Sequence, residues 1–468
     1  MRRIYLAATL LCTVLLGTGC KKFLDVNDDP NNPLGVSEKL LLPPVILTTT
    51  TQVLGGYNGS AAAYWTQQLS INQPAPGLES YRIVSNDVDN SWTFYIYPNA
   101  LKNLKTMIDQ ATNTGHYEYV AIGKALVAFN LIVATDVWGS VPYSEAFKMP
   151  EVVKPKYDSQ ESIYITAQKL LDEALVAADK TTSPIKPSQD DLIFGGDMDK
   201  WKKFIYTLKA RFYLRLVNAP GHTPAGEADN ALNALKNGFT GNADNALIEY
   251  KDGAQKENPW FKNADEGAGG LVMGKTFIDF LKNNNDPRLP IISTTDSSKV
   301  KYVGKMNGGE TVGNYMWLSR INKFYAGPGA QLFITTYAEA AFIKAEATLI
   351  KSGPAAAEPI YKEGIKAHME MLKVDTAAIR IYVSSRPALT AANALEQIIY
   401  EKYVANFLSI ETYNDWRRTG FPKLNLAENA FVNYIPRRWP YPSNETLANP
   451  QPEHKNVTTA TRVWWDTK

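Results

Sequence analysis

The chain has 468 residues, with 49 basic and 47 acidic side chains and therefore a formal net charge of +2. Its hydrophobic content of 45% is enough for one large buried core, and the balanced charge argues against a surface that binds nucleic acid. With only two cysteines, the chain cannot be a fold held together by several disulfides.

The N-terminus has the composition of a secretory signal peptide. Arg2 and Arg3 give a basic start, a largely apolar run follows, and three small residues then precede Cys20. A cysteine at this place is typical of the lipid-accepting residue of a bacterial lipoprotein, although Gly17 stands where a leucine is usual. We therefore expect residues 1–19 to be removed and Cys20 to carry the lipid.

Cleavage at that point would leave 47 basic and 47 acidic residues and no second cysteine for an intramolecular disulfide. Residues 20–33 are rich in Asn, Asp and Pro, which predicts an extended, lipidated tether. Residues 34–468 contain no clear linker, so we expect a single domain. Its best apolar run, residues 125–138, is interrupted by Asn130 and Asp136, which argues against a membrane-spanning segment.

Helical periodicity dominates this domain. Residues 159–180 carry an apolar stripe with the spacing of an amphipathic helix, and Asp158 with Glu161 predicts a capping box at its start. Residues 336–353 have the same periodicity and end at a Gly-Pro pair. Because residues 355–372 resume the pattern after so short a turn, the two segments predict a helical hairpin.

Small and large residues in these segments follow the spacing of tetratricopeptide repeats. Ala357, Tyr361 and Gly364 have the 0, 4, 7 spacing of the second helix of such a repeat, and Ala345 falls on the small position of the first. Small residues there allow paired helices to approach closely. The same spacing occurs at Ala167, Leu171 and Ala174 and at Ala228, Leu232 and Leu235. A candidate first helix precedes each triplet, at about residues 117–137, 199–218 and 333–351.

The sequence therefore predicts a mainly α fold of tetratricopeptide-like helical hairpins, with long loop insertions and a few short strands. The loops are rich in Gly, Pro, Asn and aromatic residues, and ordered loops of such length usually carry function. We expect short strands near residues 301–306 and 314–321. The segments without clear periodicity are 45–98, 139–157, 240–330 and 415–468.

Five motifs, in this order, resemble those of the SusD/RagB family of nutrient-binding outer-membrane lipoproteins. The resemblance covers nearly the whole mature chain and includes the start GCKKFLDVNDDP. The motifs are TDVWGSVPYSEA (135–146), FIDFLKNNNDPRLP (277–290), TYAEAAFIKAEA (336–347), YEKYVANFLSIETYNDWRRTGFP (400–422) and IPRRWPYPSNE (435–445).

The resemblance implies an α-helical fold on tetratricopeptide-like hairpins and a position on the outer face of the outer membrane, held there by the lipid. It also implies a SusC-like TonB-dependent transporter as partner. Members of this family lie like a lid over that barrel and bind glycans or, in some branches, peptides. The expected ligand is therefore an oligosaccharide or a peptide.

The motifs also have a structural explanation. DPRLP ends a helix at its first proline. Arg417 and Arg418 fall at a predicted helix end, where cations suit the helix dipole and Gly420 can form the left-handed cap. Trp439 and Tyr441 are expected to pack against the helices. We therefore expect the motifs to stabilise the fold without forming the ligand site.

Candidate ligand-binding residues lie in the loops, where aromatic faces occur beside amide and guanidinium groups. Such groups suit the apolar face and the hydroxyls of a sugar ring. Two of the tryptophans, at 65 and 92, fall in apparently helical stretches and can equally belong to the core, whereas those at 260 and 317 are expected to be more exposed. The candidates are Trp65, Asn72, Arg82, Trp92, Trp260, Tyr315 and Trp317.

Nucleotide binding is a competing hypothesis, because residues 269–276 (GGLVMGKT) match the phosphate-loop pattern. That loop must follow a β-strand, and the residues before Gly269 are polar. Thr276 is better explained as a helix N-cap and Lys275 as a solvated side chain. An exported lipoprotein would also meet almost no ATP, so we expect no nucleotide cofactor.

A hydrolase and a ligand-free scaffold also compete with nutrient binding. The sequence has neither G-x-S-x-G nor H-E-x-x-H, and its four histidines stand far apart, so we expect neither catalytic residues nor a metal site. A scaffold of helical repeats would bind a protein partner but no nutrient. Nutrient capture for a transporter is the preferred hypothesis.

Overall fold

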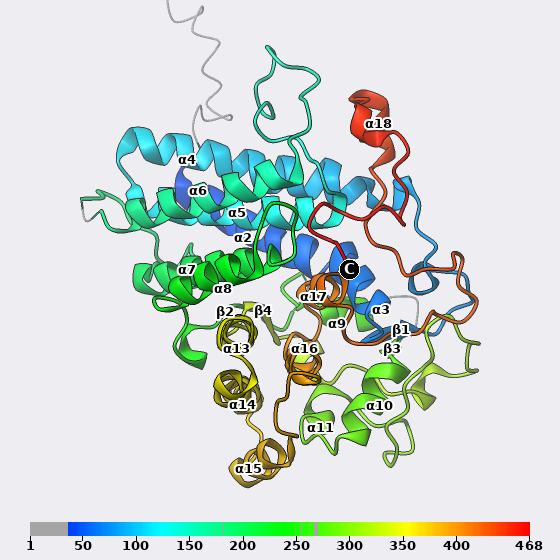
Figure 1. Cartoon of the computed structure of the whole chain (residues 1–468). Coiled ribbons are helices and arrows are strands. Elements are labelled where there is room, and N and C mark those ends of the chain that lie inside the picture. Colours follow the sequence, from blue (N-terminus) through cyan, green and yellow to red (C-terminus); the bar gives the residue numbers. More distant parts are fainter. Residues whose placement is uncertain (1–35, 181, 254, 266–269) are drawn as a thin grey trace, which may run out of the picture.

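Helices account for most of the regular structure in a computed structural model that describes residues 36–180, 182–253, 255–265 and 270–468 (Figure 1). This confirms the mainly α prediction. The expected signal peptide (1–19), the lipid site Cys20 and the tether (20–33) lie outside the described residues.

The N-terminal half of the chain contains α2 (Glu38–Leu47), the π-helix η2 (Thr48–Leu54), α3 (Tyr57–Trp65), the π-helix η5 (Ser91–Lys102), α4 (Asn103–Thr114), α5 (Tyr117–Trp138), α6 (Gln160–Ala178), α7 (Met198–Arg215) and α8 (Pro224–Leu235). After these come α9 (Pro259–Asp265), α10 (Lys275–Asn283), α11 (Leu289–Ile292), α12 (Lys323–Ala326), α13 (Tyr337–Ser352), α14 (Pro354–Met371), α15 (Thr376–Ser385), α16 (Ala394–Ala405), α17 (Glu411–Thr419) and α18 (Ser443–Ala448).

Three helical hairpins form the body of the molecule, as predicted. Helix α5 packs on α6, α7 on α8, and α13 on α14 (Figure 1). The predicted spacing explains the last pair, because Gly364 of α14 lies against the ring of Phe342. A Cβ atom at Gly364 would stand 2.9 Å from Phe342 Cε1. Glycine is therefore needed for the close approach of these two helices.

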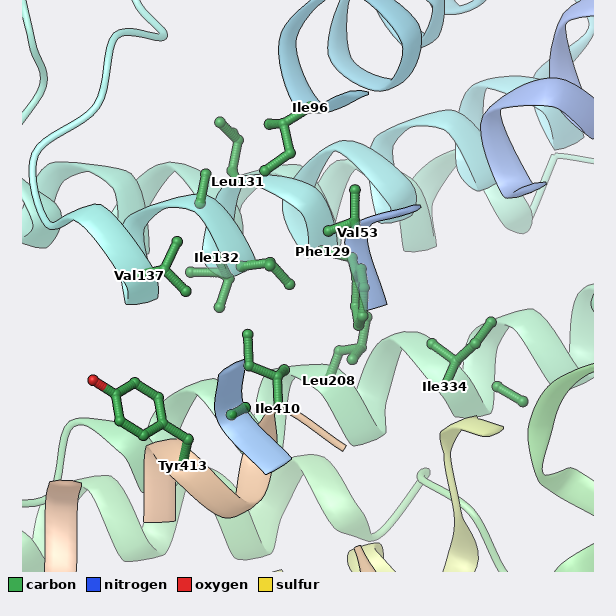
Figure 2. Packing of buried hydrophobic residues seen from close by; sticks show 14 of the residues in the cluster. Val53, Ile96, Phe129, Leu131, Ile132, Val137, Leu208, Ile334, Ile410 and Tyr413 are labelled. Atoms are coloured by element: carbon green, nitrogen blue, oxygen red, sulfur yellow. The ribbon is translucent and has the colours of Figure 1, made fainter. Parts of the chain in front are cut away.

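Helix α5 is the central helix of the body. It is long and apolar enough to pass for a membrane span, but 94% of its most apolar window is buried inside the protein, as in a core helix. Figure 2 shows Phe129 and Ile132 of α5 facing Leu208 of α7 and Ile410, which directly precedes α17. The helices far apart in sequence thus share one hydrophobic core.

The strands form two small antiparallel ladders. Strand β1 (Leu69–Ile71) pairs with β3 (Leu271–Met273), and β2 (Ala246–Glu249) pairs with β4 (Gln331–Thr335). The strands predicted near 301–306 and 314–321 are wrong. Residue 305 makes only an isolated bridge to Gly274, and residues 315–317 form a 3-10 turn, η7 (Tyr315–Trp317).

Three helix starts differ from the predictions. Ser159, not Asp158, caps α6, because Asp158 instead accepts hydrogen bonds from the backbone of the 143–144 turn. Gly274, not Thr276, is the N-cap of α10. The helix expected from about 333 begins at Tyr337, since the preceding residues are needed in β4.

A cluster of buried charges joins the hairpins to α16 and α17. Arg215 of α7 lies 2.9 Å from Asp136 of α5 and also pairs with Glu411 of α17. Arg418 Nη2 lies 2.8 Å from Glu346 Oε2 of α13. The cluster holds five cations and five anions, all buried: Arg211, Arg215, Lys402, Arg417 and Arg418, with Asp136, Glu339, Glu346, Glu411 and Asp415.

Helix α17 ends as predicted but in an unexpected environment. Gly420 adopts the left-handed conformation, with φ of 76°, and closes the helix. Arg417, however, is fully buried between the rings of Tyr413 and Trp465, 4.2 and 4.5 Å from its guanidinium carbon. Trp439 and Tyr441 pack in the same core, as predicted. The family motifs therefore build the interior of the body.

The close packing at Gly364 generates a stability prediction. Gly364→Leu should lower the free energy of unfolding by about 1–3 kcal/mol or more, because the added side chain overlaps Phe342. Thermal unfolding measures the change. Gly241→Leu is the matched control, since a Cβ atom added there meets no atom within 4 Å. Equal melting temperatures for the two variants would contradict this account of the hairpin.

Asp415 generates a pH prediction. Burial by itself would raise the pKa of Asp415, but the charges of Lys402, Arg418 and Arg215 together lower it below its ordinary value of 3.8. A carboxylate whose pKa is lower in the folded state stabilises the fold above pH 3.8, and this stabilisation is lost as the pH falls further.

Asp415→Asn should therefore be less stable than the wild type at neutral pH. The difference between their melting temperatures should stay constant down to about pH 5 and shrink below about pH 4. A difference that is independent of pH over this range would show that Asp415 is not ionised in the folded protein.

Candidate functional site

The ladder of β1 and β3 positions Asn72, one of the residues that the sequence predicts to bind the ligand. Just beyond the strands, the backbone N–H of Asn72 donates to the carbonyl of Gly270 over 2.7 Å. The side-chain amide of Asn72 donates to the carbonyl of Val312 and accepts from its N–H, over 2.9 and 2.8 Å. Asn72 thus binds Val312 in the way a neighbouring strand would. This pair of hydrogen bonds anchors the start of the loop formed by residues 312–318.

Buried Glu79 holds the segment before this loop, residues 302–309, against β1. Its carboxylate accepts hydrogen bonds from the hydroxyl of Ser70 (2.6 Å) and from the backbone N–H of Ile71 (2.9 Å) and Gly308 (2.9 Å). Lys305 Nζ, equally buried, lies 3.2 Å from Glu79 Oε1 and also donates to two backbone carbonyls. This fully bonded ion pair connects β1 to the 302–309 segment.

The loop that these contacts hold exposes an indole ring. Trp317 is 58% exposed, although it is a large apolar side chain. It lies close to Gly313, and the side chain of Asn314 caps the turn by accepting from the N–H of Met316 over 2.9 Å. Arg320 lies over the ring of Tyr315, 5.9 Å from its centroid. The loop therefore offers an aromatic face with a cation and amides beside it, held on a rigid base.

A cavity of about 650 Å³ adjoins the tip of this ladder. Its volume lies within the range of small-molecule sites. Burial raises the pKa of Tyr57 and Tyr64 in its wall, with a smaller contribution from a nearby acid in each case, so both phenols stay neutral at physiological pH. The polar or aromatic residues of the lining are Tyr57, Ser60, Tyr64, Gln73, Glu79, Lys262 and Asn263.

The structure brings four of the predicted site residues into this region. Asn72, Tyr315 and Trp317 belong to the loop pair just described. Arg82 is exposed, and its backbone N–H bonds to Gly77, which lines the cavity. The sequence did not single out Tyr57, Gln73, Glu79 or Lys262, because their roles depend on contacts between segments distant in the chain.

The other three candidates are core residues. Trp65 is fully buried against Trp439, with ring centroids 4.7 Å apart, and its N–H donates to the carbonyl of Leu78. Trp92 packs edge-on against Trp138 at 5.1 Å. The expected exposure of Trp260 is wrong, since it is only 3% exposed. Helix α9 turns this ring inward against Gly59, so none of the three offers a face to a ligand.

The phosphate-loop match does not form a phosphate site in the described part of the segment. Residues 271–273, between its two glycines, form β3, and Gly269 lies outside the described residues. Lys275 pairs with Asp279, and the hydroxyl of Thr276 donates to Gln67 over 2.5 Å. The side chains that would hold a phosphate are thus engaged elsewhere. Among described residues, no group of three or more His, Cys, Asp or Glu side chains could hold a metal ion.

Comparison with known proteins relates most of the chain to one family. Residues 30–442 match the SusD-like family model described as "Starch-binding associating with outer membrane". No curated protein gives a significant match. The fold is similar to that of a chitin-binding protein, with 25% identity, a TM-score of 0.79, and coverage of 92% of this chain and 100% of that one.

Two further solved structures show the same fold. One is a SusD/RagB family protein from Bacteroides thetaiotaomicron, with 24% identity, a TM-score of 0.76, and coverage of 92% of this chain and 99% of that one. The other is a chitin-binding SusD homolog from Flavobacterium johnsoniae, with 21% identity, a TM-score of 0.75, and coverage of 92% and 98% respectively.

The Glu79–Lys305 pair generates a prediction for the site. Glu79→Gln should cost about 3–5 kcal/mol of stability, because it leaves the buried ammonium of Lys305 without a counter-charge. Thermal unfolding and the fluorescence of the tryptophans measure the loss. Glu173→Gln removes a partly exposed pair with Lys124 and should change stability by less than about 1 kcal/mol. Similar effects of the two changes would refute the role of Glu79 as the anchor of the site.

Proposed function

The chain belongs to the SusD-like family, and we propose that it binds an oligosaccharide at the outer membrane and passes it to a SusC-like TonB-dependent transporter. The description of the family as starch-binding and associating with the outer membrane supports the ligand class and the location. The names of two structural relatives as chitin-binding proteins support a glycan as well.

One observation supports the location of the oligosaccharide site on the molecule. Trp317 is exposed on a loop that Asn72 anchors at Val312, and the two neighbours of Asn72 in the chain, Ile71 and Gln73, line a cavity of about 650 Å³. The flat apolar surface of an exposed indole suits the apolar face of a sugar ring, and its planar side chain costs little entropy to hold in place. Neighbouring amides and Arg320 can bond the hydroxyls.

The location and the partner complete the proposal. A lipid on Cys20, followed by the tether of residues 20–33, would hold the body at the surface of the outer membrane without a spanning helix. There the loops can take up ligand from solution while the body docks on the transporter. A peptide ligand and a scaffold that binds no nutrient are the competing hypotheses, and the following measurements separate them from glycan binding.

Trp317→Ala should weaken oligosaccharide binding at least roughly tenfold, because it removes the aromatic face at the centre of the site. Isothermal titration with starch-derived and chitin-derived oligosaccharides measures the affinity. Phe94→Ala is the control, since Phe94 is a similarly exposed aromatic residue on η5. Unchanged affinity in Trp317→Ala would move the site elsewhere.

The transport role has its own test. Deletion of the gene should reduce uptake of the bound oligosaccharide, and the lipidated protein should co-purify with a TonB-dependent barrel. Normal uptake in the deletion strain, or binding of peptides in place of oligosaccharides, would contradict the proposal.

A further inference from the structure

A second cavity, of about 710 Å³, lies between η2 and strand β2. One wall is formed by Thr48, Thr51 and Gln52, and the hydroxyl of Thr51 lies 2.8 Å from that of Tyr250. The opposite wall includes Gln255, Lys256 and Glu257. None of these residues belongs to the site around Trp317.

The same two segments of the chain contribute to both cavities. Thr48, Thr51 and Gln52 line the second cavity, and Gly56, Tyr57 and Ser60 of the same stretch line the first. Residues 255–257 line the second cavity, Asn263 lines the first, and Lys262 lines both. The two cavities are therefore neighbours.

The two segments touch each other at Gly55, between the residues that line the two cavities. A Cβ atom at Gly55 would stand 2.6 Å from Cγ of Pro259, so the backbone can approach helix α9 only at a glycine. The amide of Asn263 donates to the carbonyl of Gly55 over 3.2 Å. Lys262, one residue before, lines both cavities and has a partly exposed side chain.

We propose that the two cavities form one trough across Lys262, which is an extended binding site for a linear oligosaccharide that fills both. The inference rests on the proposed function and adds a preference for long chains. A single short oligosaccharide would occupy only the first cavity. A longer one gains the contacts of the second cavity without a second loss of translational freedom.

The lining of the second cavity suits a sugar chain. Hydroxyl and amide groups come from Thr48, Gln52 and Gln255, and apolar surface from Leu47 and Leu247. Its charges nearly balance, with three lysines against two glutamates: Lys251, Lys256 and Lys262 against Glu249 and Glu257. A neutral polymer with many hydroxyls meets such a surface without an unpaired charge.

Titration with two series of oligosaccharides tests the proposal. The series are maltooligosaccharides and chitooligosaccharides, from the disaccharide to the octasaccharide, added to the full mature protein. In the wild type, affinity should rise by roughly tenfold or more once the chain is long enough to cross Lys262. Gln52→Trp, which places a bulky indole in the second cavity, should abolish that rise and leave the affinity for short chains within about twofold.

Lys262→Ala should weaken the long chains more than the short ones, because the long chains cross Lys262, and Lys105→Ala, a change to an exposed side chain of α4, should behave as the wild type. Melting temperatures close to that of the wild type establish that the variants fold. Equal affinity for short and long chains in the wild type, or a rise that survives in Gln52→Trp, would overturn the trough while leaving the site at Trp317 in place. Absence of binding by every oligosaccharide, or a length-dependent gain for peptides alone, would overturn the proposed function too.

Discussion

The burial of ten charged side chains between the helices is the constraint on which the rest of the structure depends. Each ion loses its hydration in the interior, so each must find a counter-ion and hydrogen bonds in a fixed geometry. Arg215 meets Asp136 and Glu411, and Arg418 meets Glu346 and Asp415. Because these partners come from α5, α7, α13 and α17, the ion pairs join the hairpins to one another and to α17.

This body gives the loops a rigid base. The C-terminal segment packs Trp439 against Trp65 of α3, and α3 leads directly to β1 and Asn72. From there, the amide of Asn72 anchors the loop that carries Trp317 at Val312, and the carboxylate of Glu79 holds the preceding segment at Gly308. An aromatic face that is already in place loses little entropy when a ligand covers it. The structural motifs and the site are thus parts of one chain of contacts.

Sequence reasoning recovered the features that depend on local spacing. The small residues at 345, 357 and 364 predicted the α13–α14 hairpin, and Gly420 ends α17 as expected. Features that depend on distant partners were missed. Asp158 accepts hydrogen bonds from the backbone of the 143–144 turn only because the chain folds back there. Trp260 is buried because α9 holds its ring against Gly59. Likewise, nothing local marks Glu79 as the acid that meets Lys305.

A crystal structure of the mature protein with a bound oligosaccharide is the most direct test of the central claim that the loops on this rigid body form a glycan site. The account predicts a sugar ring stacked on Trp317, with the chain directed toward the cavity beside Gln73 and Lys262. A saturated complex in which the sugar lies elsewhere and leaves Trp317 exposed would contradict it.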